Sequence, residues 1–577
     1  MQRFPHRVSR RRALTSILVT GLIASGVVPA NAASGGFKTA RPAMLVGVAP
    51  GSSVTPLLTV GDVITTDDGE FRLESIPDGI SLATRGSGRV DLYINHETSR
   101  VPFPYTPAAA TEGNSQNDFD NAQVSHVILN RQSAGVLSGR YVIPSAANYQ
   151  RFCSNFLATE ANGFERDLLF TNEEAVDWIN REGNAWPATI GADEARQAGA
   201  VVAFDVKSRS YRTIWGMGRH NHENDVAIPG YGHPVVLSGD DTFTNSPSQS
   251  QMYSYIAASA AAVWNDQGGL WAFVSDDPTR QRYEDFTIGD PTSVSGHFIQ
   301  VPRLIATGRN ADGTDLMAAD VPRALGGPYL PPPNDGTWQR DSAGVGIDGP
   351  QWVLERWSQL HGVFRFVRLE DMAYDKRPAM SNVVYIADSG RGTTGAPENG
   401  RSTNGRIWRM VLDPSDPTQV DSLSILIEGD NASVKDPGSI HQPDNLETTA
   451  AGSLLITEDP GSSQQFNPGE ANATTARLWL HDLDGGVKIV AARVDQSADE
   501  GPTDVDAAAA ARLGAWESSG ILDASAAFGP GAFLIDVQAH SLWIEKQAGP
   551  DLTAPSGPDF WFKREGGQLL LIRIPGA

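Results

Sequence analysis

Short apolar runs, each followed at once by acidic or amide side chains, recur along this 577-residue chain. Six runs of this kind span residues 90–94, 167–171, 234–238, 270–274, 383–387 and 453–457. Runs of this length bounded by turn residues are typical of strands buried on both faces. Segments of alternating character lie between them, at residues 200–206, 211–215, 251–257, 405–412, 477–483 and 487–492. The pattern therefore predicts a mostly β protein.

Helical periodicity is rare, and only residues 254–263 and 507–511 favour short helices. The repetition predicts an all-β fold, a six-bladed β-propeller with minor helices, in which the apolar runs form the inner strands. A β-sandwich or a pair of barrels is the alternative. Residues 33–577 are interpreted as one propeller domain with long inserted loops at about 322–349 and 390–403. The last segment, 507–577, supplies two or three strands that are expected to close the propeller.

The acids at the strand ends suggest what chemistry this fold could carry. Inner propeller strands run parallel around one channel, so their acidic ends would meet at one mouth. Carboxylates packed that closely cannot all stay ionised without compensation. Hard cations with oxygen ligands are the usual compensation. The alternative is that each acid only caps its own strand on a solvated loop.

The first 32 residues have the features of an export signal. Residues 1–12 contain five Arg and no acid, residues 13–28 are largely apolar, and Ala30-Asn31-Ala32 has the form of a signal-peptidase site. The run Ser9-Arg10-Arg11-Arg12-Ala13-Leu14 resembles a twin-arginine signal, which exports proteins already folded. An amphipathic first helix is the alternative. We therefore expect an exported protein, either periplasmic or secreted.

Composition narrows the possible functions. The chain has 45 Lys and Arg against 68 Asp and Glu, a net charge of −23, which argues against a nucleic-acid partner. Removing residues 1–32 with their five Arg would leave 40 − 68 = −28. No apolar run reaches the roughly 20 residues of a membrane span. The single cysteine, Cys153, excludes an intrachain disulfide and any CxxC module. It is either a buried apolar side chain or a thiolate ligand.

Several segments carry side chains suited to metal and phosphate chemistry, in a specific order. They are residues 151–154 around Cys153, 169–174 ending in Glu173-Glu174, 218–224 with His222-Glu223, 237–241 ending in Asp240-Asp241, 368–371, and 442–446. In order and approximate spacing they resemble the PhoX-type alkaline phosphatases, from about Tyr93 to Asp459. The segment 154–166 lacks the usual Trp, and Thr171-Asn172 precede the Glu pair where phosphatase members tend to have Cys or Ser. The chain is thus similar to a divergent member of that family.

The resemblance implies a cluster of calcium and iron ions that binds and hydrolyses phosphate monoesters. The metal ligands that it implies are Cys153, Glu173, Glu174, Glu223, Glu370 and Asp444. Among these, Cys153 is the expected iron ligand, and Glu174 and Glu223 are the expected bridging carboxylates. His222 is expected to orient its neighbour, with direct ligation as the alternative. A soft thiolate suits iron, and carboxylates suit calcium.

The resemblance assigns Arg368, Glu370 and Asn445 to catalysis, with Arg368 gripping the substrate phosphate. A forked guanidinium fits phosphate oxygens well, and several divalent ions can polarise P–O bonds. A salt bridge from Arg368 to Glu370 or Asp371 is the plain alternative. The predicted partner is a small-molecule phosphate ester, and the protein is expected to be a monomer.

Two other functions compete with the phosphomonoesterase. A calcium-dependent lactonase or esterase propeller would also fit the segment 442–446, but it needs no thiolate ligand. A non-catalytic exported propeller would use calcium only to stabilise its fold. Gly-x-Ser-x-Gly and Gly-x-x-x-x-Gly-Lys motifs are absent from the sequence, so serine-hydrolase and nucleotide-cradle functions have little support.

Overall fold

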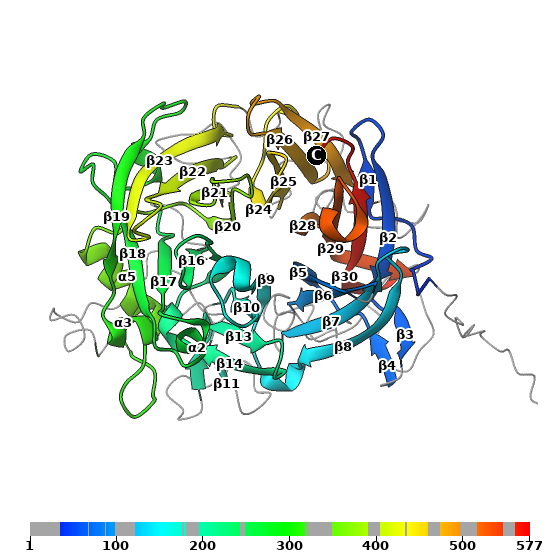
Figure 1. Ribbon diagram of the computed structural model, residues 1–577, viewed down its shortest axis with the longest axis horizontal. Coiled ribbons are helices and arrows are strands. Elements are labelled where there is room, and N and C mark those ends of the chain that lie inside the picture. Colours follow the sequence, from blue (N-terminus) through cyan, green and yellow to red (C-terminus); the bar gives the residue numbers. More distant parts are fainter. Residues whose placement is uncertain are drawn as a thin grey trace, which may run out of the picture.

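The computed structural model is built almost entirely of antiparallel strands (Figure 1). It describes residues 35–66, 69–86, 88–97, 122–175, 178–180, 195–242, 248–317, 320, 349–390, 404–432, 436–459, 474–496, 516–545 and 560–577. The predicted export signal and nearly all of the two predicted insertions lie outside these ranges. Within them, no helix is both long and apolar enough to cross a membrane.

The strands form seven sheets. One holds β5 (Pro77–Arg85), β6 (Arg89–His96), β7 (Gln123–Asn130) and β8 (Val136–Ile143). The next holds β9 (Phe152–Ala158), β10 (Leu168–Glu173), β13 (Val201–Asp205) and β14 (Ser210–Ile214). A nine-stranded sheet contains β15 (His222–Ala227), β16 (Val235–Asp240), β17 (Met252–Ile256), β18 (Gly269–Ser275), β19 (Val294–Gln300), β23 (Gln419–Glu428), β22 (Arg406–Leu412), β21 (Val383–Asp388) and β20 (Leu369–Tyr374), in that order.

Two further sheets combine both ends of the chain. One contains β24 (Pro443–Thr448), β25 (Ser453–Glu458), β26 (Arg477–Asp482), β27 (Lys488–Val494) and the early strand β1 (Leu45–Gly47). The other contains β28 (Glu517–Asp523), β29 (Ala532–Glu545), β30 (Phe560–Arg573) and β2 (Ser53–Thr59). Because N-terminal strands complete C-terminal sheets, backbone hydrogen bonds tie the two ends of the chain together.

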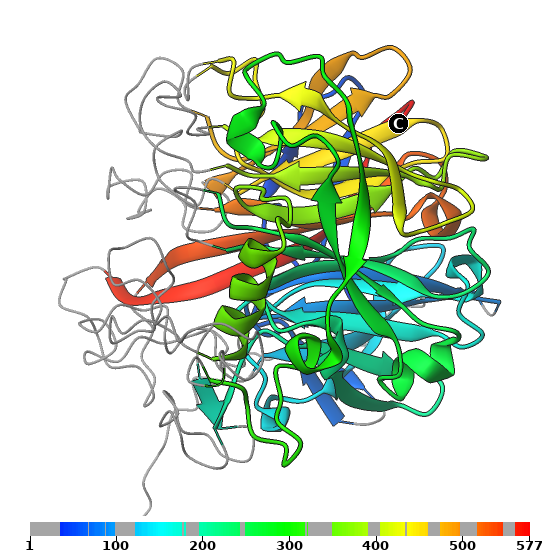
Figure 2. The ribbon, with the colours of Figure 1, turned by 90° about the vertical axis from the view of Figure 1, so that its left-hand side faces the viewer.

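The remaining elements are short. Two small hairpins pair β3 (Val63–Thr66) with β4 (Gly69–Arg72), and β11 (Trp178–Asn180) with β12 (Ala195–Gln197). The helices are α2 (Ala260–Trp264), α3 (Arg303–Thr307), α5 (Pro350–Leu360) and α7 (Ser525–Phe528), and the 3₁₀ turns are η2 (Ser145–Ala147), η3 (Glu160–Asn162), η4 (Trp215–Met217) and η5 (Tyr283–Asp285). In Figure 2, α5 lies on the outside of the sheets, and the β29–β30 hairpin extends beyond the other strands on one face.

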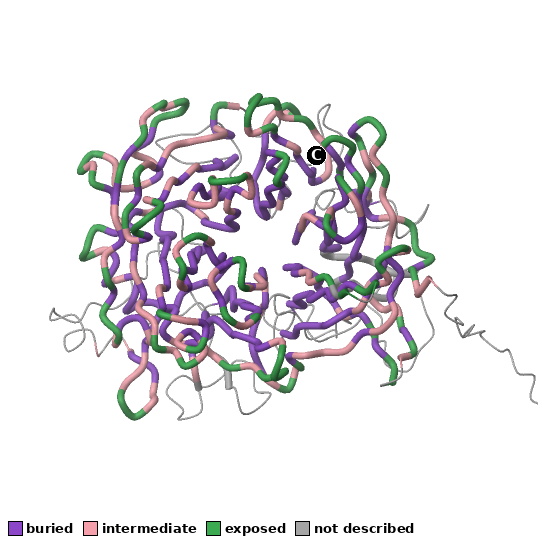
Figure 3. Tube along the Cα trace, in the orientation of Figure 1, coloured by how far each residue is buried: buried purple, intermediate pink, exposed green. Residues whose placement is uncertain are grey.

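The sheets are arranged around a common centre in a propeller-like manner (Figure 1). The strands nearest that centre contact one another in a closed order: β5, β9, β15, β20, β24, β28 and back to β5. Buried apolar clusters lie between neighbouring sheets, for example Leu92 and Leu534 in one cluster and Phe170 and Val236 in another. Figure 3 shows buried residues concentrated in the strands that surround the centre. The core is therefore divided into layers between sheets, and the apolar runs supply it.

The predicted all-β class and most of the predicted strands are confirmed, but their assignment to the centre is wrong. Five of the six apolar runs are second strands, namely β6, β10, β16, β21 and β25, and the sixth is β18, farther out in its sheet. A second strand has a strand on either side and a sheet against each face, which explains its continuous apolar sequence. The strands at the centre are instead rich in polar residues.

Smaller predictions differ in detail. Of the predicted helix 254–263, the first residues belong to β17 and the last belong to α2. The other predicted helix, 507–511, lies outside the described residues. In the C-terminal segment, β29 and the single long strand β30 (Phe560–Arg573) are paired with each other. As expected, the C-terminal segment helps to close the arrangement, through the pairing of β30 with β2.

Candidate metal and phosphate site

Every strand at the centre carries a β-bulge near its start, where two residues oppose one residue of the second strand. The bulge pairs are Asp78-Gly79, Cys153-Ser154, Glu223-Asn224, Glu370-Asp371, Asp444-Asn445 and Ser519-Gly520. Bulges of this kind redirect side chains and are common beside active sites. Four of the predicted ligands thus occupy the same position, the first residue of a bulge, on four different strands.

The side chains of the two residues of each bulge lie in different places. A cavity of about 270 Å³ is lined by the second residue of each bulge pair and by none of the first residues. The first residues Glu223, Glu370 and Asp444 instead have ligand atoms within 4.8 Å of one another. The bulges therefore direct one set of side chains to a common cluster and the other set to a cavity beside it.

Two groups of side chains in the described part of the chain could hold a metal ion. Cys153, Glu174 and Glu223 form one group, and Glu223, Glu370 and Asp444 form the other. Glu223 belongs to both, and its Oε1 accepts hydrogen bonds from the Cys153 thiol at 3.2 Å and from Ser154 Oγ at 2.9 Å. A carboxylate shared between two ligand groups is placed to bridge two ions.

Burial and mutual repulsion dominate the electrostatics of this cluster. Burial raises the pKa of Glu223, and the charges of Glu174, Glu370 and Asp444 raise it further. Burial likewise raises the pKa of the Cys153 thiol, with added contributions from Asp78 and Glu223. Burial and repulsion therefore favour the protonated forms of these groups, and bound cations would favour the charged forms.

Arg368 lies beside the cluster. Its Nε and Nη2 donate to the two carboxylate oxygens of Asp241 at 2.9 and 2.7 Å, and Nη2 lies 2.8 Å from Glu370 Oε1. Burial lowers the pKa of this guanidinium, but Asp241 and Glu370 more than offset that effect and raise it. A second arginine, Arg151, lies 3.9 Å from Glu174. The bidentate pairing fixes the plane of the Arg368 guanidinium.

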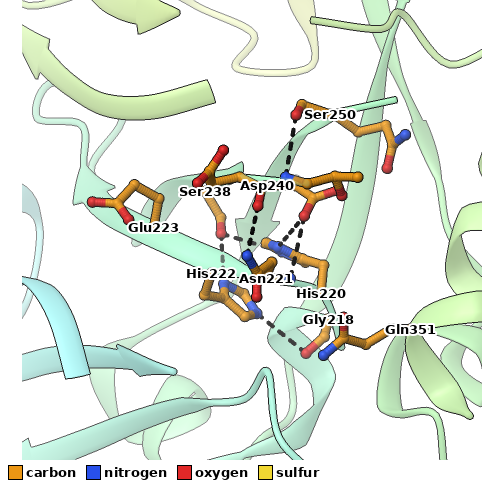
Figure 4. A network of polar contacts seen from close by, with 12 residues as sticks. Gly218, His220, Asn221, His222, Glu223, Ser238, Asp240, Ser250 and Gln351 are labelled. Atoms are coloured by element: carbon orange, nitrogen blue, oxygen red, sulfur yellow. Dashed lines mark hydrogen bonds and ion pairs between the residues drawn. The ribbon is translucent and has the colours of Figure 1, made fainter. Parts of the chain in front are cut away.

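A buried polar network lies beside Glu223, at the start of β15 and the end of β16 (Figure 4). His222 Nδ1 lies 2.8 Å from Ser238 Oγ, and the rings of His220 and His222 are tilted by 32° with centroids 3.5 Å apart. Asn221 Nδ2 donates to the carbonyl of Asp241 at 2.5 Å, and the Asp241 amide donates to the carbonyl of Asn221 at 2.9 Å. Figure 4 shows Glu223 directed away from both histidine rings.

His222 is thus next to the cluster in sequence but outside its ligand groups. Burial lowers its pKa to about 3, so the ring is neutral at ordinary pH. Its contacts with Ser238 and with the Gly218 carbonyl at 3.3 Å hold the start of β15. This geometry agrees with an orienting role for His222.

The structure brings together Cys153, Glu174, Glu223, Glu370 and Asp444, with Arg368 beside them. Glu173 lies apart from them: its two oxygens accept backbone N–H groups of Gln150 and Ala200, at 3.0 and 3.1 Å. Its assignment as a ligand stays a prediction.

Asn445 is the second residue of its bulge and lines the cavity. Its Nδ2 lies 3.4 Å from Ser154 Oγ, so it reaches Glu223 through that hydroxyl, and its catalytic role stays a prediction. Asp241, at the end of the segment 237–241, is the partner of Arg368. Asp78 was missed, although Pro77-Asp78-Gly79 has the same form as Pro443-Asp444-Asn445.

The chain is similar in sequence and in fold to known proteins. A family model described as alkaline phosphatase PhoX matches residues 156–477. The solved structure of PhoX from Pseudomonas fluorescens, in complex with vanadate as a transition-state analogue, matches with a TM-score of 0.53 and 17% identity, covering 94% of this chain and 98% of that one. A protein of unknown function from Dyadobacter fermentans matches with a TM-score of 0.37 and 9% identity, covering 91% of this chain and 100% of that one. No curated protein matches.

Proposed function

Because the chain belongs to the alkaline phosphatase PhoX family, we propose that it hydrolyses phosphate monoesters at the cluster formed by Cys153, Glu174, Glu223, Glu370 and Asp444. Family membership makes the protein a phosphoric monoester hydrolase. The observation that carries the assignment to this cluster is the position of Glu223, shared by two ligand groups with Arg368 close by. A small-molecule phosphate ester is the substrate class, and we expect a monomer.

We further propose that the fold has six blades. In this interpretation the nine-stranded sheet is two blades, β15–β18 and β20–β23, joined at their outer edges by β19. Two observations support it: the closed order of six contacting central strands, and one bulge near the start of each. Each blade would then have one bulge at the same position, near the start of its innermost strand.

The donor set fits a mixed calcium and iron site. Cys153 offers a soft sulfur ligand of the kind that iron accepts, and the carboxylates offer the oxygen ligands that calcium prefers. The pKa of each of these carboxyls is raised first by burial, as expected for acids whose compensating charge is a cation. When bound, such ions would polarise the P–O bonds and neutralise the charge that develops on the transferred phosphoryl group.

The chain's own residues would orient the substrate and maintain the charge balance. The two hydrogen bonds to Asp241 fix the orientation of the Arg368 guanidinium, which would donate to a phosphate oxygen. Glu370 contacts Arg368 and the Ser389 hydroxyl, which donates at 2.7 Å, so it links the arginine to the ligand group. Ser154 and Asn445 form a chain of hydrogen bonds to Glu223 that limits its rotation.

Metal analysis combined with an aryl phosphate assay tests this function. We expect the purified protein to contain calcium and iron and to hydrolyse p-nitrophenyl phosphate. Chelation should remove the metals and abolish the hydrolysis. Cys153→Ala should lose iron, because the thiolate ligand is gone, and its kcat/KM should fall by about 10²-fold or more. The variant should still unfold cooperatively. Unchanged iron and activity in this variant would contradict the proposed cluster. Calcium without iron, together with lactone or carboxylic-ester hydrolysis, would instead support the lactonase or esterase alternative.

We also propose export through the twin-arginine route, followed by cleavage after Ala32. The support is the Arg-rich start, the apolar stretch and the Ala30-Asn31-Ala32 motif. N-terminal sequencing of the mature protein should begin at Ala33. Replacement of both Arg10 and Arg11 by Lys should leave the uncleaved precursor in the cytoplasm.

A further inference from the structure

A second set of buried oxygen atoms lies where the last sheet of the chain meets the first. It comprises Asp78 on β5, Ser519 on β28, and Asp536 and Gln538 on β29, all of them at most 2% exposed. The side chain of Ser519 donates to Asp78 Oδ1 and accepts from Gln538 Nε2 at 3.0 Å. The hydroxyl thus joins Asp78 to Gln538.

Asp536 faces the same interface. It stands two residues before Gln538 and two after Leu534, and Leu534 packs in one apolar cluster with Ile80 of β5. Alternate residues of a strand share a face, so Asp536 and Gln538 both point towards β5. The backbones also approach closely, because a Cβ on Gly520 would lie 2.5 Å from the Asp78 carbonyl oxygen.

Four oxygen atoms of this set have no hydrogen-bond donor. They are Asp536 Oδ1, Asp536 Oδ2, Asp78 Oδ2 and Gln538 Oε1. A buried carboxylate without a partner costs several kcal/mol, about as much as removing one partner of a buried ion pair. One shared proton could form a hydrogen bond between only one pair of these atoms, whereas all four could coordinate one cation. Two carboxylates, an amide carbonyl and waters are typical calcium ligands.

Asp536 occupies a position that holds an asparagine in two of the other sheets. The second-strand residue that opposes a bulge is Asn95 opposite Asp78-Gly79 and Asn172 opposite Cys153-Ser154. Each amide donates to the neighbouring bulge, Asn95 Nδ2 to the Cys153 carbonyl at 2.8 Å and Asn172 Nδ2 to the Glu223 carbonyl at 3.0 Å. Asp536 occupies this position opposite Ser519-Gly520, but an ionised carboxylate has no proton to donate.

We propose that Asp78, Asp536 and Gln538 bind a divalent, oxygen-preferring cation of the calcium class, which joins the last sheet to the first. Asp78 lies next to Cys153, so this site adjoins the cluster of Cys153 and Glu223, whereas Asp536 and Gln538 belong to neither of the two ligand groups. It does not depend on the phosphatase reaction, since the unpartnered oxygen atoms require compensation whatever the protein catalyses.

The test compares Asp536→Asn with wild type and with Glu355→Gln. Glu355 is also buried, with one unpartnered oxygen, but it stands on α5, away from this interface. Calcium and iron per chain are measured by mass spectrometry after dialysis against metal-free buffer, and melting is followed during titration with calcium chloride. We expect Asp536→Asn to lose one calcium per chain with iron unchanged, and its melting temperature to gain less from calcium. Glu355→Gln should match wild type in both respects.

Asp536→Asn also imitates a protonated Asp536 and restores the amide found at Asn95 and Asn172. Full calcium content with equal or higher stability in this variant would therefore overturn the proposed cation site and show that Asp536 is protonated instead. If the variant does not fold, Gln538→Met removes one carbonyl ligand at similar length. It should then need at least tenfold more calcium for half-maximal stabilisation, and an unchanged requirement would overturn the proposal. Loss of iron as well as calcium would show that these residues belong to the Cys153 cluster.

Discussion

The two residues of each bulge are neighbours in sequence, yet their chemistry is opposite. At the first position, Glu223, Glu370 and Asp444 converge, and burial together with the charges of nearby acids raises the pKa of each well above its usual value. At the second position, Asp371 is just as buried but accepts N–H groups from Leu446, Met372 and Asn224. Its pKa is raised only to about 7.

This difference shows how a bulge separates two tasks on one strand. Four of the second residues bond in pairs across the central strands: Asn224 Nδ2 donates to Asp371, and Asn445 Nδ2 donates to Ser154 Oγ at 3.4 Å. The first residues are left with fewer donors, and a bound cation would stabilise their charged forms. We infer that the ring of second residues fixes the spacing of the ligands, so changes at the two positions should have distinct effects.

The largest effect is expected at Glu223, which belongs to both ligand groups. Glu223→Gln keeps the size of the side chain but removes the bridging charge, so both ions should be lost and kcat/KM should fall about 10³-fold or more. Metal content and p-nitrophenyl phosphate turnover measure this. Glu447→Gln, a buried acid paired with Lys376 at 2.6 Å, is the control and should keep its metals. A Glu223→Gln protein with full metal content would contradict the bridging assignment.

A smaller effect is expected from Arg368→Lys. Lysine keeps the charge but cannot form the two parallel bonds to Asp241, so the phosphate contact loses its fixed geometry. We expect KM for an aryl phosphate to rise about 10- to 100-fold, with metal content retained. The matched control is Arg477→Lys, because Arg477 makes the same kind of fork to Glu458, at 2.8 Å on each side. That variant should lose stability and keep its KM.

Sequence reasoning located the apolar second strands more easily than the strands that carry the ligands. Second strands such as β16 and β21 are buried by sheets on both faces, so their apolar runs are continuous. Central strands such as β15 and β24 combine polar residues with a bulge, and the bulge interrupts the alternation by which strands are recognised. The ligand strands were therefore found through a family resemblance and not through their periodicity.

The same reasoning explains which site residues were missed. Cys153, Glu223 and Arg368 lie in segments that resemble the family, so their roles could be predicted. Asp78 and Asp536 lie outside the segments that resemble the family, and their significance depends on contacts between opposite ends of the chain. The link between Arg368 and Asp241 spans 127 positions, and the spacing of the motifs does not indicate it.

The contrast within one bulge is tested most directly at Glu370 and Asp371. Asp371→Asn should keep the metals and activity but lose about 1–3 kcal/mol of unfolding free energy, because its new NH₂ group would face backbone donors. Glu370→Gln should do the reverse, losing metal with little change in the stability of the metal-free protein. Chemical denaturation of the metal-free proteins and metal analysis of the holo-proteins separate the two results. Metal loss in Asp371→Asn would show that the two positions do not have separate tasks.

The smallest effect is expected from an isolated buried acid, Glu355 on α5. Burial raises its pKa to about 7, with one hydrogen bond from Gln359 at 2.9 Å as partial compensation. The folded protein then binds a proton more tightly than the unfolded chain, so this group makes stability fall as pH rises from about 4.5 to about 7. Glu355→Gln should remove that part of the pH dependence and raise stability at pH 8 by about 1–2 kcal/mol. Denaturation at pH 5 and pH 8 measures the difference, and equal slopes for both proteins would show that burial alone does not hold a proton on a carboxyl group of this fold.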